Sequence, residues 1–261
     1  MSDLEKELRG VREAIGSGYI GFYSKGYETW KRARNIIGIF QEEIKRRSDV
    51  VNVLDIGCAN GLYIFLLNST AGNGNDLRFC GLDYSQPEII QAEKLRLALG
   101  VNNISFKAGT ATNLDSPDAC FDIVLCAEVI EHIDRPQDCL KEIKRLLKPD
   151  GLAIITTPNQ TNSILGLRTF FKLFFKNDEN SVYSYPAGHV SVKGLADWIG
   201  LIKEAGFEIE SIKRGALFAG GAKYDSHPFL FSLSIMMDLL LDWLPFSVNI
   251  TENITFKLRK H

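Results

Sequence analysis

Apolar and polar positions along the chain follow two periods. Short apolar runs typical of buried strands recur from residue 51 onward, and segments of helical periodicity separate most of them. Strands are predicted at residues 51–55, 78–83, 104–107, 121–126, 152–157, 207–213 and 252–259. Helices are predicted at residues 61–69, 87–99, 136–148 and 193–205. Strands that alternate with helices indicate an α/β fold, in which helices cover both faces of a mostly parallel sheet.

Helical patterning also precedes the first strand. Residues 3–48 carry charged and apolar positions that predict two or three helices. Farther along, Asp134 and Gln137 have the spacing of a capping box for the helix at 136–148. Pro149 is expected to end that helix, because proline cannot continue the backbone hydrogen bonding of a helix.

The most informative segment is VLDIGCANG at residues 53–61. An apolar run ends at an acidic residue, Asp55, and Gly57 and Gly61 then frame a polar turn that leads into a helical pattern. This order describes a buried strand, a tight turn and a helix N-terminus, which is typical of a nucleotide-binding site. Asp83 ends the next apolar strand 22 residues after Gly61, close to the spacing at which a carboxylate meets ribose hydroxyls in doubly wound folds.

Glycine placement narrows the kind of nucleotide. The dinucleotide fingerprint requires glycines at 57, 59 and 62, and the chain has Gly57, Ala59 and Leu62, which disfavours an NAD-dependent oxidoreductase. A G-x-G-x-G pattern is met at Gly57 and Gly61 and departs only at Ala59. In this pattern, and in the acidic residues that close the two strands, the chain resembles class I S-adenosylmethionine-dependent methyltransferases. The resemblance is to the type 11 branch with the ubiquinone-biosynthesis O-methyltransferases, and it extends over about residues 50–215.

The resemblance implies a Rossmann-like sheet of seven strands with an antiparallel last strand, in a single methyltransferase domain at 1–261. The expected parts are a helical N-terminal lid at 1–49, a cofactor-binding core at 50–157, an insertion or lid at 158–192 and the C-terminal half of the sheet at 193–261, with an apolar helix at 229–244. The implied cofactor is S-adenosylmethionine.

The resemblance also implies roles for individual residues at the cofactor. Asp55 would support the turn near the methionine amino group, Asp83 would accept hydrogen bonds from both ribose hydroxyls, and Tyr84 would lie against the adenine. Relatives often carry an acidic residue where this chain has Thr110, so the Thr110 hydroxyl or the backbone of Ala111 would meet the adenine amino group. The expected cofactor contacts are Asp55, Gly57, Cys58, Asn60, Gly61, Asp83, Tyr84, Thr110, Ala111 and Glu128.

A cluster of acidic and histidine residues follows the strand at 121–126. In CAEVIEHIDRP, a helical turn would place Glu128, Glu131 and His132 on one face, where a proton, a cation or a basic partner must offset the repulsion between the two carboxylates. His189 could complete the set. The spacing resembles the metal site of small-RNA 2′-O-methyltransferases, which implies a Mg, Mn, Fe or Zn ion with Glu128, Glu131, His132 and His189 as its ligands.

The same cluster allows two metal-free interpretations. Glu131, His132 or His189 could act as a general base or position the acceptor, because an alcohol must lose a proton when it is methylated. Alternatively, Glu128 borders the cofactor and His132 only caps or packs, as in metal-free relatives. In each case the cluster follows a strand's carboxyl end, where ligands bind in open α/β sheets.

Composition restricts the partners. With a net charge of -2 and a pI near 6.1, the chain lacks the basic excess typical of nucleic-acid binding, and a small-molecule acceptor is expected. Its five cysteines lack CxxC spacing, which favours reduced thiols over disulfides or a zinc cluster. The charged N-terminal sequence MSDLEKELRG has no apolar signal segment, so a cytoplasmic location is expected.

Two apolar segments bear on the acceptor. Residues 164–176 place Arg168, Lys172 and Lys176 along one side of an apolar helix, which fits a lid over the site, a peripheral contact with a membrane, or both. The stretch at 229–246 includes two aspartates and should not span a bilayer. Its wide apolar surface suits a partner or a hydrophobic acceptor.

The sequence therefore predicts an enzyme that transfers a methyl group from S-adenosylmethionine to the hydroxyl oxygen of a small, apolar or membrane-associated acceptor. One alternative is a metal-free methyltransferase that acts on a saccharide, an amine or a carbon atom. Another is a non-catalytic module that only binds S-adenosylmethionine. The sequence leaves the identity of the acceptor and the oligomeric state open.

Overall fold

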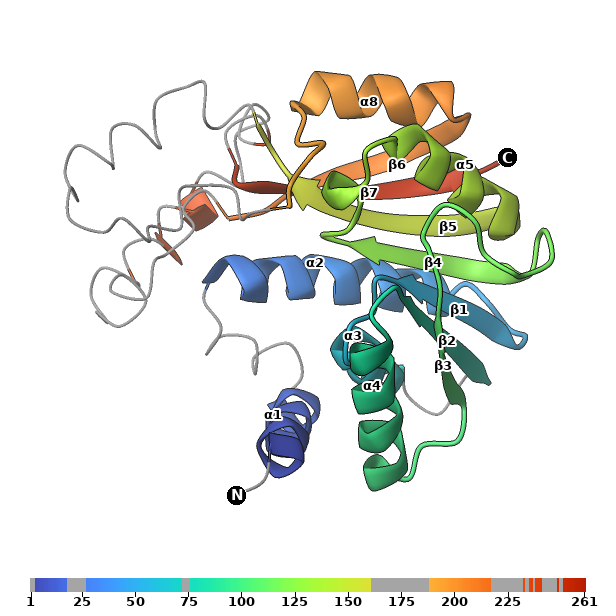
Figure 1. Ribbon diagram of the computed structural model, residues 1–261. Coiled ribbons are helices and arrows are strands. Elements are labelled where there is room, and N and C mark those ends of the chain that lie inside the picture. The colour runs from blue at the N-terminus through green and yellow to red at the C-terminus, as the bar shows by residue number, and fades with distance from the viewer. Residues whose placement is uncertain are drawn as a thin grey trace.

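Seven strands form one sheet in the order β3-β2-β1-β4-β5-β7-β6 (Figure 1). The computed structural model describes residues 3–17, 27–71, 76–160, 188–216 and 251–261, together with 232, 235–236, 238–240 and 248. The strands are β1 (Val51–Ile56), β2 (Leu77–Asp83), β3 (Ile104–Ala108), β4 (Phe121–Ala127), β5 (Leu147–Pro158), β6 (Phe207–Arg214) and β7 (Asn253–Lys260). Each of them overlaps a strand that the apolar runs predict.

Strand direction follows from the connections. The pairs among β1 to β5 are parallel, whereas β7 pairs antiparallel with both β5 and β6. Helices connect the parallel neighbours because a parallel pair needs a crossover. The seven-stranded α/β fold with an antiparallel last strand is confirmed, and β6 runs parallel to β5 because both oppose β7.

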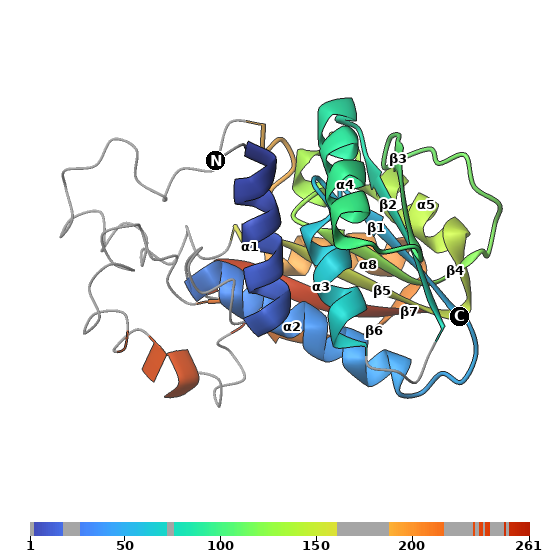
Figure 2. The same ribbon diagram turned by 90° about the horizontal axis from the view of Figure 1, so that it is seen from below.

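Helices cover both faces of the sheet (Figures 1 and 2). They are α1 (Asp3–Ser17), α2 (Tyr27–Ile44), α3 (Leu62–Thr70), α4 (Gln86–Leu99), α5 (Pro136–Leu146) and α8 (Leu195–Glu204). Successive residues of a strand point to opposite faces, so Val53 of β1 packs in the core beside α2, α3 and α4, and Leu54 packs in the core beside α5 and α8. The sheet is therefore buried on both sides.

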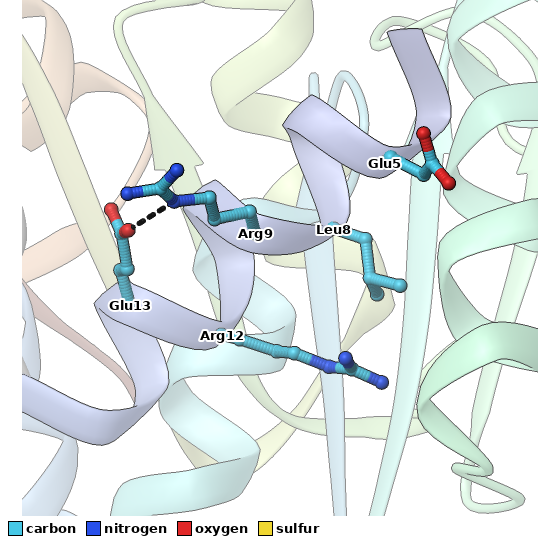
Figure 3. A pocket seen from close by; sticks show the side chains of 5 residues that line it. All are labelled: Glu5, Leu8, Arg9, Arg12 and Glu13. Carbon is cyan, nitrogen blue, oxygen red and sulfur yellow. Dashed lines mark hydrogen bonds and ion pairs between the residues drawn. The ribbon is translucent and has the colours of Figure 1, made fainter. Parts of the chain in front are cut away.

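The two N-terminal helices have different positions. α2 is part of the core, with Ile36, Ile39 and Phe40 fully buried against the sheet. α1 packs outside it, against α3 and α4, through Leu4, Leu8 and Ile15. The outer side of α1 carries charges of both signs around a shallow hollow, where Arg9 donates a 2.8 Å hydrogen bond to Glu13 (Figure 3).

The boundaries of α5 differ from the predicted ones. The N-cap is Arg135 rather than Asp134, and Pro136 occupies the first turn, where its fixed φ is favourable and its missing N–H costs nothing. The helix ends at Leu146, before Pro149, because Leu147 already pairs with Phe121 in the sheet. Pairing with β4 thus overrides the local stop signal.

Several predicted segments lie outside the described residues. They are most of the insertion at 158–192, with the basic apolar helix at 164–176, and most of the apolar helix at 229–244. Within the described parts of the chain, no helix has the length and apolar character needed to cross a membrane.

The buried position of α2 has a measurable consequence. Phe40 is fully buried and its ring lies 6.2 Å, centroid to centroid, from that of Phe79 in β2. Replacing Phe40 by alanine should lower the free energy of unfolding by about 3–5 kcal/mol, because it leaves a cavity in the core. Leu97→Ala, at a side chain that is 68% exposed on α4, should change it by less than about 0.5 kcal/mol. Urea unfolding followed by circular dichroism compares the two.

Candidate functional site

The sheet has a topological switch between β1 and β4. The chain leaves β1 toward β2 on one side, whereas β4 leads to β5 on the other side. In open α/β sheets, the loops that follow two such strands separate, and ligands bind in the crevice at the carboxyl ends of the strands. The candidate residues Asp55, Asp83 and Glu131 all lie at this edge or just beyond it.

The turn after β1 depends on glycine. Gly57 and Gly61 have φ angles of 75° and 81°, in the left-handed region that side chains disfavour. A Cβ atom at Gly57 would lie 2.2 Å from Val129 Cγ2, and one at Gly61 would lie 2.6 Å from Phe106 Cζ. Ala59, the departure from the three-glycine pattern, adopts a φ of 46° and so occupies the same region as the glycines.

Two buried carboxylates flank this turn. Asp83 fixes its backbone, because Oδ2 accepts from the Ala59 N–H at 2.8 Å and Oδ1 from the Ser85 N–H at 2.9 Å. Each carboxylate oxygen has a second acceptor position, so Asp83 can still accept from two ribose hydroxyls. Asp55 is 2% exposed, and its Oδ2 has no hydrogen-bond partner among the described residues. Burial, and then the charge of Asp83, raise the pKa of Asp55 well above its usual value.

The remaining predicted cofactor residues lie around the same turn. Asn60 donates a 3.3 Å hydrogen bond to Glu7 of α1, which ties the outer helix to the turn. Tyr84 is 85% exposed and therefore offers a ring face to a ligand. Thr110 is exposed, and its hydroxyl lies 3.4 Å from the Asn113 carbonyl oxygen. Cys58 is buried, and its backbone N–H donates to the carbonyl oxygen of Leu82, the residue before Asp83.

Glu128 is separated from the other two members of its motif. Its φ of 56° breaks the helical turn expected over 128–132, and only Ile130–His132 forms a short 3-10 helix. The Glu128 carboxylate accepts from the Thr156 hydroxyl at 2.9 Å and pairs with Arg32 Nη1 at 3.1 Å. The expected single face with Glu128, Glu131 and His132 is therefore not formed.

Glu131, His132 and His189 do come together. One ligand atom from each lies within 4.8 Å of the others, and the two imidazole rings are 4.5 Å apart, centroid to centroid. The loop carrying His189 is held by the backbone of Glu131, whose carbonyl oxygen accepts from the N–H groups of Val190 and Ser191 at 3.0 and 2.9 Å. His189 thus joins Glu131 and His132, which lie 58 and 57 positions earlier in the sequence, in one group.

The ionisation of this group follows from its surroundings. Glu131 is fully buried, and neither carboxylate oxygen has a hydrogen-bond partner among the described residues. Burial, and then the charge of Glu128, raise the pKa of Glu131 to about 8. His132 Nδ1 lies 2.9 Å from the Gly188 carbonyl oxygen, which can only accept, so this nitrogen carries a proton, and Nε2 faces Glu131 Oε1 at 4.0 Å. Burial, followed by the proximity of His132, lowers the pKa of His189.

Comparison with known proteins identifies this arrangement. A family profile described as a methyltransferase domain matches residues 47–198, which is more than half of the chain. The chain belongs to this family. It is a class I S-adenosylmethionine-dependent methyltransferase by sequence and by strand order, as the glycine turn predicts. The turn fits that cofactor, since Asp55 keeps a buried oxygen without a hydrogen-bond partner among the described residues, which can accept from a cationic group.

Named relatives share about half of the chain. It is 33% identical over 128 residues to the ubiquinone biosynthesis O-methyltransferase of Rickettsia conorii, covering 48% of this chain and 42% of the relative. It is 37% identical over 126 residues to the demethylmenaquinone methyltransferase of Lactobacillus johnsonii, covering 46% and 50%. The chain thus spans about half the length of these curated relatives. A solved geranyl diphosphate methyltransferase in complex with SAM shares the fold, with a TM-score of 0.58 at 9% identity, covering 87% of this chain and 85% of that chain.

Sequence reasoning missed Arg32. This residue lies in α2, far from the family motifs, but its guanidinium reaches Glu128 at 3.1 Å and the Tyr63 hydroxyl at 3.4 Å. No pattern around Arg32 distinguishes it from the other charged residues of the N-terminal helices. A signal could have come from Glu128, whose carboxylate needs a partner if it is to be partly buried beside Glu131.

Two glycines allow a matched test of the turn. Gly61 and Gly100 both have left-handed φ angles, but a Cβ atom at Gly61 would clash with Phe106, whereas nothing lies within 4 Å of one at Gly100. Gly61→Ala should therefore weaken the affinity for S-adenosylmethionine by about tenfold or more, and Gly100→Ala should leave it within about twofold. Isothermal titration calorimetry with the demethylated cofactor measures both. Equal affinities would contradict a role of this turn in binding.

Proposed function

We propose that the protein transfers a methyl group from S-adenosylmethionine to the hydroxyl oxygen of a small, apolar or membrane-associated acceptor. The observation that carries this proposal is the fully buried Glu131 carboxylate, without a hydrogen-bond partner among the described residues, beside His132 and His189 at the carboxyl end of β4. Such a group suits an acceptor that must lose a proton. The name of the Rickettsia conorii relative, a ubiquinone biosynthesis O-methyltransferase, agrees with an oxygen acceptor.

The cofactor would occupy the turn after β1. In this proposal Asp83 binds the ribose hydroxyls, Tyr84 lies against the adenine, and the backbone of Gly57 and Gly61 lines the methionine end. Asp55 supports that end as an anion facing the cofactor's positive charge. Cys58, Asn60, Thr110, Ala111 and Glu128 complete the proposed contact set.

The chemistry assigned to the cluster is proton removal and positioning. Methyl transfer is an in-line displacement: the acceptor oxygen forms a bond to the methyl carbon while the carbon–sulfur bond breaks, and its electron pair stays on sulfur. The hydroxyl proton passes to Glu131 or to Nε2 of His132. His189, whose lowered pKa keeps it neutral, can hold the acceptor by a hydrogen bond.

A divalent cation at the same cluster is a second candidate. Glu131, His132 and His189 offer one carboxylate and two imidazole ligands within 4.8 Å of one another, which suits magnesium, manganese, iron or zinc. Glu128 would support this site from outside, because its carboxylate already pairs with Arg32. A bound divalent cation lowers the pKa of a hydroxyl that it coordinates. Its charge would also offset the cost of the buried Glu131 carboxylate.

Glu131 as a base predicts a specific pH dependence. With a pKa of about 8, the carboxyl group is protonated at low pH, so methyl transfer should rise with pH through about 8. Glu131→Gln should reduce turnover by about 10²- to 10⁴-fold and remove this rise. The exposed Glu204→Gln on α8 serves as a control. Incorporation of labelled methyl groups into a panel of phenols, polyprenylated quinol precursors, sugars and amines provides the measurement.

The same panel separates the alternatives. A methylated amine or sugar would favour the alternative of a metal-free methyltransferase that acts on a saccharide, an amine or a carbon atom. Cofactor binding without any transfer would favour a non-catalytic module.

The cation candidate makes a separate prediction. Dialysis against a chelator should abolish transfer by the wild-type protein, and Mg, Mn, Fe or Zn should restore it. Mn²⁺ or Zn²⁺ should also raise the melting temperature of the wild type, because a ligand of the native state stabilises it, but not that of His189→Ala. Full activity in the presence of chelator would leave proton removal by Glu131 or His132 as the function of the cluster.

A further inference from the structure

A basic groove lies between α2 and the edge strand β6. Four cations line it, Lys31 and Arg34 from α2 and Lys213 and Arg214 from β6, and this set is called the basic groove below. Arg34 is exposed, with its guanidinium 5.7 Å above the ring of Trp30. These charges are distant in sequence from the cofactor motifs, and the proposed methyl transfer assigns them no task.

Buried and exposed cations of the groove differ in their partners. Asp238 pairs with Lys31 and, at 2.7 Å, with Arg214 Nη1, so one carboxylate faces two cations. Lys213 lies 4.0 Å from Glu42, whose carboxylate is 59% exposed and therefore well screened by water. Arg34, which is exposed, and Lys213, which is half-buried, therefore present positive charge to solvent.

An exposed apolar face adjoins the groove. Residues 235–236 and 238–240 are helical, and Asp238 anchors them through the groove cations and a 2.5 Å hydrogen bond from the Tyr27 hydroxyl. This anchoring leaves Met236, Leu239 and Leu240 exposed by 53%, 47% and 63%. They are three of the eight exposed large apolar side chains of the described residues, gathered within five positions. They are called the apolar face below.

The location of these two features links them to the site. Arg214 ends β6, which runs parallel to β5, so the groove reaches the same edge of the sheet as the carboxyl ends of β4 and β5. The helical residues 235–236 and 238–240 lie beside the N-terminal end of α2 in both views (Figures 1 and 2). A partner bound at the groove and the apolar face would therefore lie near the edge of the sheet that carries Glu131.

We propose that the basic groove and the apolar face together bind the surface of an anionic lipid bilayer. Met236, Leu239 and Leu240 enter the interfacial region, where each buried CH₂ group adds to the affinity. Arg34 and Lys213 contact the phosphates of the headgroups, and Lys31 and Arg214 hold the helical residues in place through Asp238. Apolar side chains flanked by cations are the combination that a bilayer surface with anionic lipids recognises.

Two other occupants fit less well. A second copy of the chain, docked by two-fold symmetry, would place the same cations opposite themselves, and this repulsion disfavours the pairing. A nucleic acid binds through its phosphates and would gain nothing from the exposed Met236, Leu239 and Leu240. Only a bilayer rewards both the apolar and the cationic side chains.

Vesicle binding tests the proposal without reference to methyl transfer. The full chain should co-sediment with vesicles of phosphatidylglycerol and phosphatidylcholine, but only weakly with vesicles of phosphatidylcholine alone. Arg34→Glu combined with Lys213→Glu should weaken partitioning by about tenfold or more. Leu239→Ser combined with Leu240→Ser should do the same, because apolar burial is lost. Added salt should weaken binding by the wild type.

Matched controls exclude general effects of charge and polarity. Arg78→Glu changes a 66% exposed arginine on β2, near the opposite edge of the sheet, and Leu97→Ser changes a 68% exposed leucine on α4. Both should bind vesicles as the wild type does. Melting by circular dichroism should be unchanged in all variants, because the substituted side chains are exposed or half-buried.

Three results would overturn the proposal. The first is equal partitioning into vesicles with and without anionic lipid. The second is binding that neither pair of substitutions weakens more than its control. The third is absence of vesicle binding together with a dimer, seen by analytical ultracentrifugation, that Leu239→Ser with Leu240→Ser dissociates. None of these results bears on whether the protein transfers methyl groups.

Discussion

The parallel alignment of the strands is the constraint from which the site follows. Because β1, β2, β4, β5 and β6 all run in one direction, the residues that end them collect at one edge of the sheet. Side chains that are far apart in the sequence, such as Asp55, Asp83 and Glu131, become neighbours there without any local motif that joins them. The strand order reverses beside β1, so the loops at this edge diverge. The helices on both faces of the sheet bury the side chains next to it.

Burial at this edge raises the pKa values of Asp55 and Glu131. Water would solvate Asp55 and Glu131 on the surface, but here each is nearly or fully buried, and the charged form is disfavoured. The rest of the core must offset this cost. The extensive apolar layers on both faces of the sheet do so, and a cationic ligand would reduce the cost further. A site of this kind is less stable when empty than when filled, which is typical of binding sites.

Much of the fold was accessible to sequence reasoning because periodicity reports burial directly. The strands and the glycine turn were predicted, since a buried parallel strand needs a continuous apolar run and a left-handed turn needs glycine. The N-cap of α5 was assigned to Asp134 and is instead Arg135, because Pro136 occupies the first turn. The helix ends at Leu146 because Leu147 already pairs with β4. Helical spacing also failed at Glu128, whose left-handed backbone interrupts the expected turn and whose carboxylate pairs with Arg32. Such contacts between elements that are distant in the sequence follow no local sequence pattern, so they could not be predicted.

The loop that carries His189 is hydrogen-bonded to the backbone carbonyl oxygen of Glu131 and not to its carboxylate. The position of the loop and the chemistry of residue 131 are therefore independent of each other. The backbone carbonyl oxygen holds the loop, and the side chain sets the chemical properties of the site. A lineage could exchange the acidic group for an amide or an aliphatic residue and keep the same backbone scaffold. Divergence toward new acceptors would then require few compensating changes elsewhere in the chain.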